Sequence, residues 1–269
     1  GLTYGFMNSH PVDALYRNAS IGGERQGSTL QGMIDDLADI PLSFTPGSRW
    51  NYSVSTDVCG YLVQLFSDTD LDVFVRERIT KPLGMNDTGY QVPASSRDKF
   101  AACYRYKRGG GFELQDNPAS SVYHERPTFF SGGGGMVATI DDYSRFAQML
   151  LNRGEFDGYR ILGRKTVEYM ATNHMPGNVD LAAMGQPVFS ETSYHGIGFG
   201  LGFSVVLDPA AAGVLDSPGE FAWGGAASTY FWVDPLEDMT VVFLTQLLPS
   251  STHPIRRELK TLIYQAITN

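Results

Sequence analysis

Strand-forming segments are concentrated late in this chain, and that distribution restricts the folds it can adopt. Residues 198–207, 229–233 and 239–245 are rich in aromatic and β-branched side chains, which favour strands. The last two segments are separated by a stretch that begins Asp234-Pro235, a composition typical of a hairpin loop. We therefore expect a small antiparallel sheet, preceded by helices and loops and followed by a helix that covers it.

Helical patterns occur on both sides of these strands. Residues 55–67 repeat apolar side chains at the spacing of one helical face, and residues 163–172 predict a shorter helix. Thr139 followed by Asp142 is typical of a capping box, so a helix should begin at residue 140. A last helix is expected over residues 254–268, with an apolar stripe made of Ile255, Leu259, Leu262, Ile263 and Ala266.

These patterns divide the chain into two regions. Residues 1–190 are expected to be mainly helix and loop, and residues 191–269 to hold the antiparallel strands and the C-terminal helix. The fold class is therefore α/β of the α+β type, an antiparallel sheet flanked by helices plus a mainly helical domain.

Composition excludes several classes of function. The net charge of -9 and the pI near 5 argue against binding to nucleic acid or to anionic membranes. The longest apolar run, residues 239–244, is the size of a strand and too short to span a bilayer. Cys59 and Cys103 have no metal or redox spacing, and Cys59 lies among apolar helix positions, which predicts a buried free thiol. The compartment, cytoplasmic or periplasmic and secreted, stays open.

Common hydrolase motifs are absent or poorly placed. The sequence has no Gly-x-Ser-x-Gly, and its histidines are too scattered for a zinc site, so we expect no metal and no cofactor. One Ser-x-x-Lys occurs, from Ser96 to Lys99, and such a tetrad supplies the nucleophile of β-lactamases and penicillin-binding proteins. Because its surroundings are polar, we interpret it as a surface turn.

A tyrosine on a short loop is the clearest candidate for chemistry. Tyr52 follows a Pro46-Gly47 turn and precedes the helix predicted over residues 55–67. A tyrosine held in this way can transfer protons if a nucleophile and a cation lie beside it. The cation is needed because the pKa of a free phenol is about 10.

The motifs as a set resemble the serine β-lactamase-like family, which includes class C β-lactamases, DD-peptidases and β-lactamase-type carboxylesterases. The resemblance covers nearly all of the chain in the right order. It rests on residues 46–53, 81–88, 133–146, 196–208 and 223–226.

The family pattern begins earlier than this sequence does. Its Ser-x-x-Lys lies upstream of a segment resembling Gly1-Leu2-Thr3, so the resemblance implies that the nucleophile and its lysine precede residue 1. The N-terminal helix and first strands of the sheet would also be upstream. Residues 239–245 would then form an exposed apolar edge, covered by that N-terminal segment or by a second copy of the chain.

The resemblance also assigns roles to individual residues. Tyr52 takes the place of the catalytic tyrosine, and Val54 stands where β-lactamases carry an amide-binding asparagine. Trp223, Gly224 and Gly225 replace the Lys-Thr-Gly that attracts a substrate carboxylate, and the Ala226 N–H would be an oxyanion donor. Aromatic residues that could line an acyl pocket are Trp50, Phe129, Phe130, Tyr194 and Phe199.

These replacements favour neutral esters over β-lactams. We therefore expect the C-terminal portion of a carboxylesterase that works through an acyl-serine intermediate on a small ester or amide substrate. A β-lactamase or D-amino-acid peptidase is the enzymatic alternative. A catalytically inactive binding or scaffold fragment is the alternative of another class. The chain alone is expected to be inactive.

Overall fold

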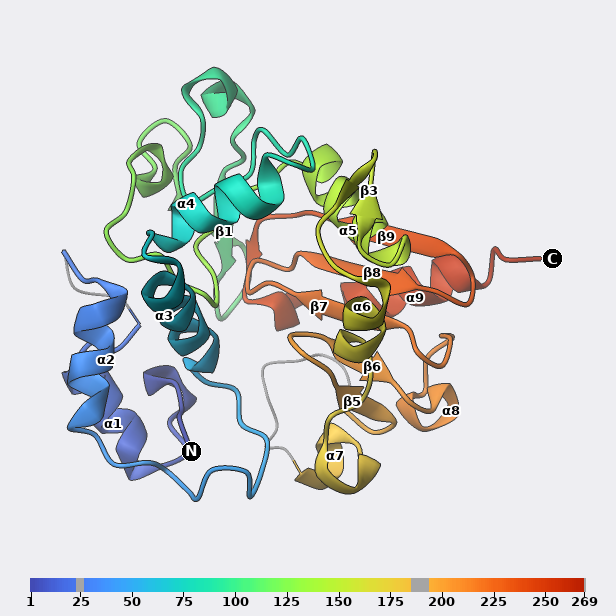
Figure 1. The fold of residues 1–269 in the computed structure, drawn as a ribbon, viewed down its shortest axis with the longest axis horizontal. Coiled ribbons are helices and arrows are strands. Elements are labelled where there is room, and N and C mark those ends of the chain that lie inside the picture. Colours follow the sequence, from blue (N-terminus) through green and yellow to red (C-terminus); the bar gives the residue numbers. More distant parts are fainter. Residues whose placement is uncertain (23–26, 185–193, 269) are drawn as a thin grey trace.

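The computed structural model describes residues 1–22, 27–184 and 194–268, and its main sheet is antiparallel with five strands (Figure 1). This confirms the expected sheet, with one difference. Residues 198–207 form two strands because the chain reverses at Gly202, whose φ of +94° suits glycine. The strands, in spatial order, are β5 (Ile197–Phe199), β6 (Ser204–Val206), β7 (Phe221–Gly224), β8 (Tyr230–Asp234) and β9 (Met239–Phe243).

The first part of the chain forms a helical region with its own core. α3 has the bounds that its apolar spacing predicts, and Val54, directly before it, is fully buried in this core with Tyr16 and Leu30. Figure 1 shows α1, α2 and α3 together, on the side of the molecule away from the C-terminus. The helices are α1 (Pro11–Asn18), α2 (Leu30–Ala38), α3 (Ser55–Ser67), and α4 (Leu71–Val75), which continues into the π-helical turn η2 (Arg76–Thr80).

A second core lies between the sheet and α5 (Ile140–Leu151). The Thr139 side chain accepts from the Asp142 N–H, as the capping pattern predicts. The Asp142 carboxylate, however, accepts from the Asp87 N–H at 2.8 Å and the Thr88 hydroxyl at 2.9 Å. The start of α5 is thus fastened to the loop that follows η2, which lies far from it in the sequence.

Alternation along β8 puts different helices on the two faces of the sheet. Phe231 packs against Tyr143 of α5 with ring centroids 5.1 Å apart. The next residue, Trp232, is fully buried on the opposite face, where Lys260 of α9 (Ile255–Tyr264) lies 5.8 Å from its ring. This follows from the period of two in a strand.

The face of α9 that covers the sheet differs from the one expected. Arg256 and Lys260 are the buried residues of this helix, and Tyr264 lies 2.6 Å from Asp234 of β8. The predicted apolar stripe is only partly covered, and Leu262 is 59% exposed. Buried charges on the sheet select this face, because the carboxylates of Glu220 and Asp234 need donors that the apolar stripe lacks.

A small three-stranded sheet joins the two regions. Its strands are β10 (Leu247–Leu248), β1 (Cys103–Tyr106) and β2 (Phe112–Asp116), and β10 pairs with β1 in parallel. β1 and β2 lie in the region expected to be mainly helix and loop. The boundary that we placed at residue 190 falls outside the described residues.

None of the helices described is both long and apolar enough to cross a bilayer.

The remaining elements are short. They are β3 (Glu155–Phe156), β4 (Tyr159–Arg160), α6 (Arg164–Met170), α7 (Leu181–Met184), α8 (Pro209–Ala212) and the 3-10 turns η1 (Gly5–Met7), η3 (Ala94–Lys99), η4 (Val122–His124), η5 (Pro176–Asn178) and η6 (Ser250–Thr252).

Candidate active site

The Tyr52 loop is held at both ends by hydrogen bonds from distant segments. It begins at a tight turn in which Gly47 has φ +83° and the Ser48 N–H donates to the Thr45 carbonyl, as a Pro-Gly turn requires. The Asn51 side chain then donates to the Leu2 carbonyl at 2.8 Å, and the Trp50 N–H donates to the Met184 carbonyl. The loop is therefore fixed although it has no regular secondary structure.

Asp57, in the first turn of α3, ties this loop to the glycine-rich segment before α5. Its carboxylate accepts from the Ser131 hydroxyl and from the N–H groups of Gly132 and Gly133. Burial raises the pKa of Asp57, and these hydrogen bonds oppose the rise. A Cβ at Gly132 would lie 2.0 Å from the Thr56 carbonyl oxygen, so the two segments touch through backbone.

The end of β7 is equally crowded, which explains its two glycines. A Cβ at Gly224 would lie 2.5 Å from Nη2 of Arg256, and one at Gly225 would lie 2.3 Å from Oγ1 of Thr229. Any larger residue would displace one of these groups. Packing restricts Gly224 more strongly, because the backbone carbonyl oxygen of Thr229 would also lie 2.8 Å away, whereas at Gly225 only the Thr229 side chain would have to move.

The turn between β7 and β8 leaves several N–H groups without an acceptor in the described residues, and that of Ala226 is one of them. The Ser228 N–H donates to the Gly225 carbonyl, and the Gly225 N–H donates to the Thr229 carbonyl. On its other side the turn is bound to β10, because the Ser228 hydroxyl donates to the Leu247 carbonyl at 2.7 Å. No acceptor within the described residues faces the N–H of Ala226, an exposed residue.

The structure brings Tyr52 and Trp223 together, as a site that combines them would require. Their ring centroids are 6.3 Å apart. Trp223 also contacts Phe199 at 5.4 Å, and Phe199 contacts Trp50 at 5.2 Å. Tyr4 packs on the other side of Tyr52 at 5.1 Å, so a row of aromatic rings connects the helical region with the sheet.

The electrostatic surroundings hold the proton on Tyr52. Burial raises the pKa of its phenol, Tyr194 and Asp57 raise it further, and Arg256 lowers it. The net shift is upward, so a phenolate at this position needs an additional cation. Burial likewise raises the pKa of Tyr4.

Lysines that could supply this cation are placed elsewhere. All five lysines of the sequence are described, and in the described residues none of them is bonded to Tyr52 or to a serine hydroxyl. Three of them bind carboxylates, namely Lys81 with Glu77, Lys165 with Glu168, and Lys260 with Glu220. Over the same residues, no group of three or more His, Cys, Asp or Glu side chains could hold a metal ion.

The Ser96–Lys99 tetrad lies in a 3-10 turn with residues 97–99 exposed, as expected of a surface turn, but Ser96 itself is buried and its hydroxyl donates to the Asp87 carboxylate. The expectation about Cys59 was wrong. Cys59 is exposed and Cys103 is buried. Cys59 therefore lies on the outer side of α3, although its place among apolar helix positions predicts burial.

The aromatic residues expected around an acyl pocket fall into two groups. Trp50 and Phe199 join the row described above, and Tyr194 is close enough to raise the pKa of Tyr52. Phe130, by contrast, is buried in the core of the helical region, and Phe129 packs against that core. Val54 is also a core residue there, so its side chain offers no polar group to a ligand.

Sequence reasoning missed Tyr4, Asp57 and Arg256. Arg256 has a signal, because Arg256, Lys260 and Tyr264 recur at four-residue intervals and so share one helical face. Nothing in the sequence marks Tyr4 or Asp57, because their partners are distant.

The arrangement of an antiparallel sheet with helices on both faces and a helical region beside it is a β-lactamase-like α/β fold. The solved structure of EstCE1, a hydrolase with promiscuous acyltransferase activity, superposes with a TM-score of 0.79 at 24% identity, over 98% of this chain and 68% of that one. The beta-lactamase family model matches residues 1–265, and the chain belongs to this family.

Two relatives of the chain are longer than the part of them that it matches. Protein Rv1367c of Mycobacterium tuberculosis is 35% identical over 93% of this chain and 60% of its own length. Esterase EstB of Burkholderia gladioli is 30% identical over 78% of this chain and 52% of its own length. The chain thus spans little more than half the length of these relatives.

Proposed function

We propose that this chain supplies the proton-transfer tyrosine and the oxyanion turn of a carboxylesterase whose nucleophilic serine and lysine come from a segment outside these 269 residues. The observation that carries the proposal is the contact between Tyr52 and Trp223, next to a turn whose Ala226 N–H has no acceptor in the described chain. A proton-transfer group and a free donor at one place are what acyl transfer requires.

In the reaction, the serine hydroxyl gives its proton to the Tyr52 phenolate while its oxygen attacks the ester carbonyl carbon. The Ala226 N–H donates to the oxyanion of the tetrahedral intermediate. When the intermediate collapses, the bond to the alcohol breaks and the Tyr52 phenol returns the proton to the leaving oxygen. Water then attacks the acyl-serine by the same route. The surroundings described above raise the pKa of Tyr52 and so hold its proton. The positive charge of the incoming lysine is therefore needed to favour the phenolate.

The residues around this centre support esters as substrates. Trp223 and Gly224 offer no ammonium or hydroxyl group to a substrate carboxylate, and Val54 offers no amide. The half-buried aromatic row of Trp50, Phe199 and Trp223 suits an apolar acyl chain. The 30% identity with esterase EstB is consistent with this choice.

The test compares a short-chain p-nitrophenyl ester with nitrocefin, using the longer protein that includes the expected Ser-x-x-Lys segment. We expect the ester to be the better substrate. A preference for nitrocefin would instead support a β-lactamase or D-amino-acid peptidase. Tight ligand binding without turnover of either compound would support a binding or scaffold protein.

The open edge of the sheet is also expected to be covered in the whole protein. β9 is the last strand in the described sheet, and its five residues are all half-buried. We propose that the N-terminal segment of the longer protein pairs with this edge, a second copy of the chain being the alternative occupant. Size-exclusion chromatography of the longer protein tests this, because a monomer is expected.

A further inference from the structure

Arg256 is a buried cation directed at the candidate oxyanion turn. It is the second residue of α9 and is 9% exposed. Its guanidinium carbon lies 5.3 Å from the centre of the Tyr230 ring, and burial raises the pKa of that phenol to about 12. Arginine stays protonated in proteins, so a fixed positive charge lies behind β7 and β8.

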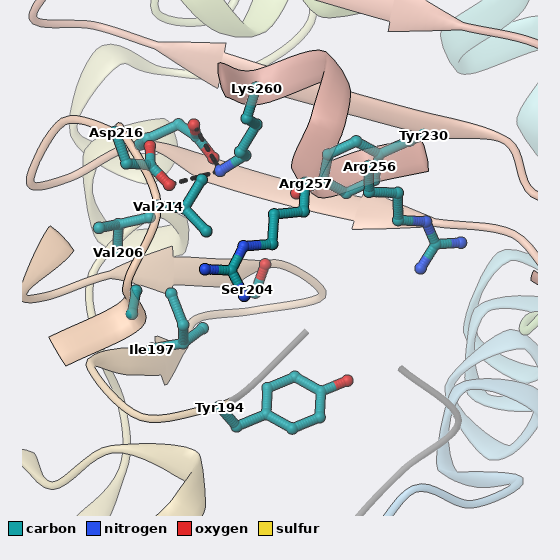
Figure 2. A pocket seen from close by; sticks show the side chains of 12 residues that line it. Tyr194, Ile197, Ser204, Val206, Val214, Asp216, Tyr230, Arg256, Arg257 and Lys260 are labelled. Carbon is teal, nitrogen blue, oxygen red and sulfur yellow. Dashed lines mark hydrogen bonds and ion pairs between the residues drawn. The ribbon is translucent and has the colours of Figure 1, made fainter. Parts of the chain in front are cut away.

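The neighbouring side chains of α9 have other partners. Figure 2 shows Lys260 bonded to carboxylates, Asp216 among them, that lie away from the Arg256 guanidinium, and Arg257 extending along a cavity of about 60 Å³. Arg257 donates to the Gly213 carbonyl at 2.8 Å. Arg256 extends in a different direction from both.

Two hydrogen bonds of Arg256 go to carbonyls that close the turn. Nη2 donates to the Gly225 carbonyl at 2.9 Å and to the Thr229 carbonyl at 3.3 Å. The same two carbonyls accept the N–H groups of Ser228 and Gly225. One guanidinium therefore bridges the end of β7 and the start of β8.

The Gly225 carbonyl and the Ala226 N–H belong to one peptide group. Because a trans peptide is planar, its C=O and N–H point in opposite directions, and fixing one fixes the other. A cation at the carbonyl also polarises the peptide and makes its N–H a stronger donor. The missing side chain of Gly224 leaves the space in which the guanidinium lies.

We propose that Arg256 is a positioning residue that orients and polarises the Gly225–Ala226 peptide, so that the Ala226 N–H faces the acyl group as a strengthened oxyanion donor. This rests on the proposed function, because the positioning role is exerted through the Ala226 N–H, while the charge of Arg256 separately lowers the pKa of Tyr52. Arg256 itself does not touch the substrate.

The first test is made on this chain without any reaction, by amide NMR and hydrogen exchange. In Arg256→Met the Gly225 and Ser228 amide protons should exchange faster by about tenfold or more. This is the change in rate expected when the turn loses one hydrogen bond from a charged group. The Ala226 amide proton should shift upfield as its peptide loses polarisation. Arg256→Lys, which keeps the charge and the stem, should fold and lie in between. Arg257→Met is the matched control and should leave these amides unchanged.

The second test is made on the longer, active protein. Arg256→Met should lower kcat by about tenfold or more and leave KM little changed, because the donor is strengthened only where the oxyanion forms. Unchanged amides in Arg256→Met and Arg256→Lys would overturn the inference, as would altered amides with unchanged kcat. A wild-type protein inactive on every ester would refute the proposed function instead, and the amide comparison would still decide whether Arg256 holds this peptide.

Discussion

Replacing Gly224 with alanine tests the packing behind the candidate oxyanion turn. The new methyl group would lie 2.5 Å from Nη2 and 2.6 Å from Cζ of Arg256, and 2.8 Å from the Thr229 carbonyl oxygen. Since non-bonded carbon atoms pack at about 3.5–4.0 Å, these groups must move by roughly 1 Å. Overpacking of this kind lowers the free energy of unfolding by about 1–3 kcal/mol. For a chain of this size, each 1 kcal/mol lowers Tm by about 2–4 °C.

The assay is urea unfolding of a double-mutant cycle that pairs Gly224→Ala with Arg256→Ala. Removing the guanidinium should relieve most of the crowding, so the two changes should couple by about 0.5–3 kcal/mol. Relief is partial because the Thr229 carbonyl remains. The control is Gly134→Ala, where the added methyl meets nothing within 4 Å. Strictly additive effects, or a Gly224→Ala variant as stable as the control, would refute the packing argument.

Three further predictions concern stability and exposure. Lys260→Met removes the ammonium between two buried carboxylates and should lower the free energy of unfolding by about 3–5 kcal/mol in urea, whereas an unchanged midpoint would contradict a buried ion pair. Burial acts to raise the pKa of Asp13, but hydrogen bonds from Thr3 and from neighbouring residues outweigh it and hold that pKa below the usual 3.8. A depressed pKa stabilises the fold above the unfolded value, and the gain is lost as pH falls, so wild-type stability should drop more steeply between about pH 5 and 2 than that of Asp13→Asn. Equal slopes in urea melts would oppose this. A maleimide should label Cys59 rapidly and Cys103 only on unfolding, because burial also raises the pKa of the Cys103 thiol, and rapid labelling of both would contradict the structure.

Much of the local structure could be predicted from the sequence, because local patterns determine it. The bounds of α3 follow from apolar spacing, and the start of α5 follows from the Thr139 cap. The β8–β9 hairpin follows from its loop, in which the Asp234 carboxylate accepts from the N–H groups of Leu236 and Glu237. Each of these features depends on neighbours within a few residues.

Features set by distant partners were missed. α9 turns its charged face inward because buried acidic residues on the sheet require donors, and periodicity alone predicts the opposite face. β1 and β2 are mostly exposed and show no inward apolar face, although the run of glycines between them was a hairpin signal. The contact between Tyr52 and Trp223 joins segments far apart in sequence, so the resemblance named both residues but spacing could not bring them together.

The most direct measurement is the turnover of a short-chain p-nitrophenyl ester by the longer protein with Tyr52→Phe. Phenylalanine keeps the aromatic contacts of Tyr52 and removes only the hydroxyl, so the free energy of unfolding should change little. Loss of a proton-transfer group lowers turnover by about 100-fold or more, and we predict such a loss. Unchanged turnover in a folded variant would contradict the role proposed for Tyr52.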